Sequence, residues 1–180
     1  MVRLLSCLMI LAWWCGAARA EPVDAGRAVV DLVAERTAVV PGDRFFAALS
    51  LDMDDGWHVY WRYAGDAGIP PLIKWDEATV AARGEFIWPA PYEIEYVPGE
   101  IMDYGYNDSV LLPFEVTVPE DASGEIVLSG LADYLICADI CIPESARISL
   151  TLPVAATPGF DQEAGAAIAG AVRKAPIAFE

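Results

Sequence analysis

The sequence predicts an all-β protein, an antiparallel sandwich followed by a short C-terminal helix. Between about residues 27 and 153, apolar and polar residues alternate with a period of two in a series of short segments, as in half-buried strands. The intervening segments are rich in Gly, Pro, Asp and Asn, which are typical turn residues. After Pro158 the chain becomes rich in alanine, which favours a helix.

Two segments show the alternation most clearly, AVVDLVAER (28–36) and FFAALSLDM (45–53). The turns VPGD (40–43) and DDG (54–56) follow them. Because every second residue of a strand points to the same side, each segment is expected to bury one apolar face. The expected buried faces are Val30, Leu32 and Ala34 in the first segment and Phe45, Ala47, Leu49, Leu51 and Met53 in the second.

Further strands complete a series of seven to nine, which indicates an immunoglobulin-like sandwich, with a small barrel as the alternative. Two intervening segments, 62–71 and 90–108, are expected to be long, irregular loops, and such loops on a rigid sandwich often carry function. The further expected strands are WHVYW (57–61), LIKW (72–75), EFIW (85–88), VLLPFEVTV (110–118), EIVLSGLADYLI (125–136) and ARISLTLPV (146–154).

The first 20 residues have the layout of a secretory signal peptide. Arg3 precedes the apolar run LLSCLMILAWW, and AARA ends at Ala20, where cleavage is expected. The bulky Trp13 and Trp14 disfavour a lipoprotein signal with Cys15 as the lipidated residue. The predicted organisation is therefore a signal peptide (1–20), one domain (21–157) and a C-terminal helix or linker (158–180), in which Asp161 is the expected N-cap.

The predicted location is the periplasm. No later segment of the sequence is long and apolar enough to cross a membrane, so no span is expected in the mature chain. The chain carries 11 basic and 27 acidic residues, a formal net charge of −16. Such a surface repels nucleic acid and anionic lipid, which are excluded as expected partners.

Cys137 and Cys141, in YLICADICIPE (134–144), are the two cysteines beyond the predicted signal peptide. In a straight strand their Cα atoms would lie about 13 Å apart, whereas a disulfide needs less than about 7 Å. If the two residues bond, the segment between them must turn. The pair is therefore expected at the tip of a hairpin or bulge near the surface, in a compartment where disulfides form.

Three interpretations of the pair remain open from the residues alone: a structural disulfide, a redox pair and a metal clip. Closing so short a loop stabilises a fold by only about 2 kcal/mol, so a domain of this size hardly depends on it. A copper(I) site is conceivable with His58, the one histidine, but a four-ligand zinc site cannot be assembled from these residue types. No metal or other cofactor is predicted.

The charges near the pair disfavour a reactive thiolate. Asp139 lies between the cysteines, Glu144 follows, and no basic residue is closer than Arg147. Nearby carboxylates raise the pKa of a thiol. Exchange is therefore expected to begin with a partner's more acidic thiol attacking the disulfide.

Three stretches resemble the N-terminal periplasmic domain of DsbD/ScsB-type thiol:disulfide interchange proteins, a family of protein-disulfide reductases. They are DDGWHVYWRYAGDAGIPPLIKW, YGYNDSVLLPFEV and YLICADICIPESARISLTLP, in this order. The resemblance covers roughly residues 25–155. The three-residue spacing within the cysteine pair is closer to the ScsB-like branch than to DsbD itself.

The resemblance implies an immunoglobulin-like domain with one redox-active pair, here Cys137 and Cys141. Such a domain accepts electrons from a membrane-embedded thiol reductase domain and passes them to disulfide-bonded periplasmic proteins. We expect Cys141 to be the partner-facing thiol. The resemblance also implies a shielding cap loop with an aromatic residue, which matches Tyr104 with Asp103 beside it, and two tyrosines near the pair, whose positions match His58 and Tyr60.

The chain departs from the family pattern because family members usually continue into a membrane domain and a thioredoxin-like domain. The electron donor is therefore expected to be supplied in trans. The alternative function is a non-enzymatic binding module with a structural disulfide or a copper(I)-handling site.

Overall fold

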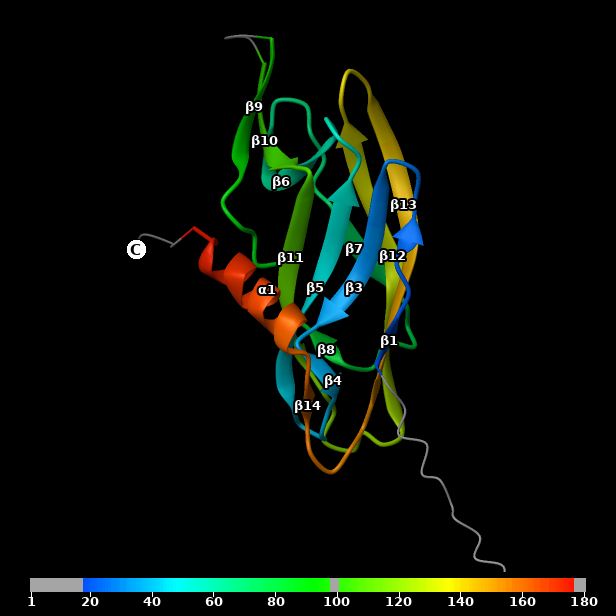
Figure 1. Cartoon of the computed structure of the whole chain (residues 1–180). Helices are drawn as coiled ribbons and strands as arrows, with labels where there is room; N and C mark the ends of the chain where they lie inside the picture. The colour runs from blue at the N-terminus through cyan, green and yellow to red at the C-terminus, as the bar shows by residue number, and fades with distance from the viewer. Residues whose placement is uncertain (1–17, 98–100, 177–180) are drawn as a thin grey trace, which may run out of the picture.

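Two antiparallel β-sheets pack face to face in the computed structural model, which describes residues 18–97 and 101–176 (Figure 1). The first sheet has the order β1-β13-β12-β6-β10-β9, and β7 also pairs with β12. Its strands are β1 (Arg19–Ala20), β6 (His58–Gly65), β7 (Leu72–Trp75), β9 (Tyr92–Val97), β10 (Ile101–Asn107), β12 (Glu125–Cys137) and β13 (Cys141–Pro153).

The second sheet has the order β2-β3-β5-β11-β8 and is also antiparallel. A separate two-stranded sheet joins β14 to β4. The prediction of an immunoglobulin-like β-sandwich with a C-terminal helix is confirmed. The strands of these two sheets are β2 (Val23–Asp24), β3 (Ala28–Ala34), β4 (Arg36–Ala38), β5 (Arg44–Met53), β8 (Ala82–Arg83), β11 (Ser109–Thr117) and β14 (Gly159–Phe160).

The core lies between the facing sheets and contains the apolar faces that the alternation predicts. In β3 and β5 all eight predicted core residues are buried. The facing strand β12 buries every second residue from Ile126 to Ile136, and all of these except Gly130 belong to the same apolar core. Burial of side chains of this kind is the main stabilising term of the fold.

The hairpin of β12 and β13 places the cysteines at one end of the sandwich (Figure 1). The two strands stay in register over their whole length, from the pair Glu125 and Pro153 to the pair Cys137 and Cys141. The turn closes with the amide of Ala138 donating to the carbonyl of Ile140 at 3.0 Å. The cysteines therefore face each other at the tip of a hairpin.

Two expectations about the stretch from residue 85 to 108 are wrong. The expected loop 90–108 instead forms the hairpin of β9 and β10, in which consecutive residues pair, from Tyr92 with Gly105 to Val97 with Ile101. The expected strand EFIW (85–88) is irregular, although the amide of Ile87 donates to the carbonyl of Pro113. Because Pro113 has no N–H, β11 cannot return a ladder bond at that position.

The expected loop 62–71 is shorter than predicted, because β6 continues to Gly65 before the chain turns. This extension lies beside β10, whose Asp103 pairs with Gly65 across a bulge. The shortened loop, 66–71, then leads directly into β7.

Helix α1 (Gln162–Arg173) lies across the outer side of the second sheet and contacts β3, β5 and β11 (Figure 1). Asp161 is its N-cap, as predicted, and one carboxylate oxygen accepts from the amides of Glu163 and Ala164. Ile168 of this helix is fully buried. No helix in the described part of the chain is long and apolar enough to span a membrane.

Most of the predicted signal peptide lies outside the described residues. Its last two residues, Arg19 and Ala20, form β1 and pair with Thr151 and Leu150 at the edge of β13. Cleavage after Ala20 remains a prediction, and it would remove β1 from this edge.

Candidate functional site

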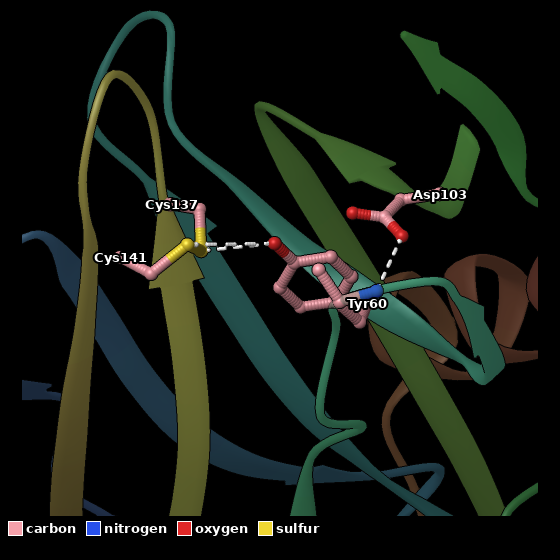
Figure 2. The surroundings of a disulfide bond; sticks show 5 residues. Tyr60, Asp103, Cys137 and Cys141 are labelled. Carbon is pink, nitrogen blue, oxygen red and sulfur yellow. Dashed lines mark hydrogen bonds between the residues drawn. A yellow bond between two sulfur atoms is a disulfide. The ribbon is translucent and has the colours of Figure 1, made fainter. Parts of the chain in front are cut away.

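A disulfide joins Cys137 to Cys141 at the hairpin tip, with their Cα atoms 4.1 Å apart (Figure 2). The two residues differ sharply in exposure. Cys137 is 0% exposed, whereas Cys141 is exposed to solvent. A reagent in solution therefore reaches this bond from the side of Cys141.

Tyr60 is the side chain that lies against the disulfide (Figure 2). Its hydroxyl donates to Sγ of Cys137 at 3.0 Å and lies 3.6 Å from Sγ of Cys141. The tyrosine is fully buried, and it forms a small apolar cluster with Ala64 and Cys137 against which Leu135 packs. This cluster lies on the outer face of the first sheet, because Cys137 has the strand parity opposite to that of the core residues of β12.

The loop that follows β6 covers the Tyr60 ring. At Gly68 the backbone is so close to the ring that an added Cβ would lie 2.1 Å from Cδ1 of Tyr60. No residue with a side chain fits there unless the loop or the ring moves. The tyrosine hydroxyl is thus held at the sulfur by backbone packed on the ring.

Asp103, predicted as a supporting residue, anchors this loop. Its Oδ1 accepts from the amide of Ala67 at 3.0 Å, as Figure 2 shows. A second tie joins the same segments, because Oδ2 of Asp66 accepts from the amide of Met102 at 3.0 Å. Asp103 is fully buried, and its Oδ2 has no hydrogen-bond partner among the described residues.

His58, also predicted, pairs in register with Cys137 across β6 and β12. Its ring meets that of Tyr60 edge to face, with centroids 5.3 Å apart. Burial lowers the pKa of His58 below its usual 6.5, and the nearby carboxylate of Asp103 opposes part of this effect. The neutral imidazole is therefore the favoured form at neutral pH.

Tyr104, the predicted cap residue, is half-buried in β10 and pairs in register with Glu93 of β9. The structure thus brings Tyr60 and His58 to the disulfide, places Asp103 on the loop behind Tyr60, and leaves the shielding role of Tyr104 a prediction. The tip of the hairpin that carries Tyr104 lies outside the described residues.

Glu144 braces the hairpin on the other side, towards the second sheet. Its carboxylate accepts from the amide of Arg27 at 3.1 Å and from the hydroxyl of Tyr134 at 3.0 Å. Burial raises the pKa of the Tyr134 hydroxyl, and the charge of Glu144 adds to this increase. The tyrosine thus remains protonated and able to donate.

Sequence reasoning did not single out Gly68, Ala64 or Leu135. The two glycines and two prolines of segment 62–71 marked a loop, but nothing local showed that the loop would cover Tyr60. Among the described residues, no group of three or more His, Cys, Asp or Glu side chains is arranged to hold a metal ion.

Comparison with known families agrees with this arrangement. The family described as "Thiol:disulfide interchange protein DsbD, N-terminal" matches residues 29–153. The chain belongs to this family. Comparison with curated proteins found no significant match.

A solved structure supports the same fold for this DsbD N-terminal family member. The chain is similar to the N-terminal periplasmic domain of ScsB from Proteus mirabilis, with a TM-score of 0.64 and 23% sequence identity. The similarity covers 89% of this chain and 59% of the ScsB chain. The protein described here thus spans about three fifths of the length of that ScsB domain.

Proposed function

We propose that this chain is a periplasmic thiol–disulfide exchange domain, a protein-disulfide reductase module that relays electrons through Cys137 and Cys141. The proposed donor is a membrane-embedded thiol reductase domain, and the proposed acceptors are disulfide-bonded periplasmic proteins. The observation that carries the proposal is the unequal exposure of two bonded sulfurs, with Cys141 exposed and Cys137 buried against a hydroxyl donor. A disulfide is accessible to thiol–disulfide exchange when one of its two cysteines is exposed to solvent.

In the proposed reduction, a thiolate of the donor attacks Sγ of Cys141. The bond between Cys141 and Cys137 breaks, a mixed disulfide joins the donor to Cys141, and the electron pair of the broken bond stays on Cys137. The hydroxyl of Tyr60, 3.0 Å from Cys137, then donates to a thiolate rather than to a disulfide sulfur. Hydrogen bonds to charged groups are the stronger kind, so this contact favours Cys137 as the leaving sulfur.

The donor's second thiol then attacks its own sulfur in the mixed disulfide and releases Cys141. The donor is oxidised to a disulfide, and the pair in this chain is reduced to two thiols with the uptake of two protons. In the second half of the relay, the thiolate of Cys141 attacks an acceptor disulfide and forms a mixed disulfide with one acceptor sulfur. The thiolate of Cys137 then attacks Sγ of Cys141 and displaces that acceptor sulfur. The Cys137–Cys141 bond forms again, and the acceptor leaves as a dithiol.

The family match and the fold support this proposal at the level of thiol–disulfide interchange. A redox titration of the pair against glutathione or dithiothreitol tests it. A functional pair has a midpoint above about −300 mV, whereas a structural disulfide lies below that value.

A double variant separates function from folding. Cys137→Ser with Cys141→Ser should abolish exchange with protein thiols and lower the thermal unfolding midpoint by at most about 4–8 °C, because so short a loop stabilises by only about 2 kcal/mol. A double variant that is unfolded at room temperature would instead make the bond a structural disulfide.

A further inference from the structure

Several exposed apolar side chains lie on the strand and the two loops that surround the disulfide. Ile140 in the hairpin turn is 64% exposed, Ile69 in the loop before β7 is 57% exposed, and Leu72 at the start of β7 is 42% exposed. Pro143, two residues after Cys141, is also exposed. Exposed apolar side chains that are contiguous on a surface indicate an interaction site, whereas single exposed apolar side chains are normal.

The strand register places Leu135 and Pro143 on the same face as the two cysteines. Cys137 pairs with Cys141, and the next pair on the same face is Leu135 with Pro143. Leu135 also packs against the cluster that contains Cys137.

The same face continues from β12 onto β7 and the preceding loop. Leu72 pairs with Asp133, one position further along the face of β12 than Leu135. Ile69 follows Gly68, which lies on the ring of Tyr60. We define the apolar strip as Ile69, Leu72, Leu135, Ile140 and Pro143.

Paired charges border the strip on the side away from the disulfide. Lys74 Nζ lies 2.6 Å from Oδ2 of Asp133. Beyond it, Arg147 Nη1 lies 2.7 Å from Oδ1 of Asp76. The members of the strip are uncharged, and the carboxylates beside it are the exposed Asp139, next to Ile140 in the turn, and Asp133, which pairs with Leu72.

We propose that the apolar strip is the docking surface for the protein that exchanges with Cys141, and that this partner carries its reactive cysteine within an apolar surface. The inference rests on the proposed function. A partner thiol that reaches the exposed sulfur brings its own surface against the hairpin. A typical interface covers about 800 Å² on each partner. Leu72 lies about 13 Å along the sheet from Cys137, so an interface of that size centred on the disulfide includes it.

The test compares a protein thiol with a small thiol on the full chain. The probes are reduced thioredoxin, whose cysteine lies in an apolar surface, and dithiothreitol. The variant is Ile69→Gln with Leu72→Gln, which removes apolar surface without adding charge. The matched control is Val127→Gln, a 36% exposed residue on the same face at the far end of β12.

The expected result is an approximately tenfold fall in the second-order rate of reduction by thioredoxin for the double variant, as for truncation of interface anchors. Reduction by dithiothreitol should stay within about twofold of the wild type, because a small thiol needs no docking surface. Val127→Gln should react with both probes as the wild type does.

Other outcomes overturn the inference in distinguishable ways. Wild-type rates of the double variant with thioredoxin, or an equal loss with dithiothreitol, would remove the strip as a docking surface and leave the proposed function standing. The same holds if thioredoxin fails to reduce a wild-type disulfide that dithiothreitol opens. A wild-type bond that resists both probes would overturn the proposed function and the docking surface together.

Discussion

The hydroxyl of Tyr60 lies 3.0 Å from Sγ of Cys137 and is its hydrogen-bond donor (Figure 2). The sulfur that receives this bond is the buried one, and the sulfur beside it, on Cys141, is exposed. The structure therefore distinguishes two cysteines that are equivalent in the bond they share.

Tyr60→Phe should slow reduction of the disulfide by dithiothreitol by about tenfold or more, because a hydrogen bond to a thiolate contributes about 1.5–3 kcal/mol. Stopped-flow or quenched alkylation kinetics measure this rate. The matched control is Tyr106→Phe, because this second buried tyrosine hydroxyl donates to the carbonyl of Pro89, away from the sulfurs. Equal slowing in both variants would assign the effect to general loosening of the fold.

Single cysteine variants should differ in reactivity. In Cys137→Ser the remaining thiol of Cys141 is exposed and should be alkylated by iodoacetamide under native conditions. In Cys141→Ser the remaining thiol lies in a fully buried position and should react at least about tenfold more slowly, since reactivity requires access. Mass spectrometry follows both reactions, with unfolded protein as the reference, and the reverse order would contradict the assignment of Cys141 as the partner-facing thiol.

Gly68→Ala should lower stability by about 1–3 kcal/mol, because its Cβ would overlap the Tyr60 ring and overpacking of this kind forces neighbours to move. The same variant should slow reduction of the disulfide, since the displaced ring moves its hydroxyl away from Cys137. Urea unfolding and reduction kinetics measure the two effects. Gly84→Ala is the control, because its nearest contact is the amide nitrogen of Glu115 at 3.6 Å, an ordinary distance.

His58 should make the fold less stable as pH falls. Because burial lowers its pKa in the folded state, the unfolded chain binds a proton below about pH 6.5 that the folded chain binds only at lower pH. This contribution to stability is complete above pH 6.5 and is lost as pH falls through the folded pKa. The carboxylate of Asp103 reduces the loss but does not reverse it.

Urea unfolding of the wild type and of His58→Gln at several pH values between 5 and 7.5 measures this effect. The wild-type stability should fall more steeply with decreasing pH, by at most about 1.4 kcal/mol per pH unit, because one proton is involved. Parallel curves for the two proteins would contradict the prediction.

Much of the fold followed from local patterns. The alternation in β3 and β5 marked the buried faces correctly, and Asp161 marked the helix start. The spacing of Cys137 and Cys141 required a turn between them, and the hairpin of β12 and β13 provides it. These features depend on residues within a few positions of one another, so a single sequence contains them.

The surroundings of the disulfide depend on which strands become neighbours, and only the tertiary structure decided that. Tyr60 is separated from Cys137 by 77 positions, and the order of β12 and β6 in the sheet brings them together. The burial of Cys137 beside β6, and the anchoring of the loop at Ala67 by Asp103, likewise follow from contacts between distant segments. Periodicity shows which residues of a strand share a face, but not which strand or loop will pack against that face. That depends on packing across the whole chain.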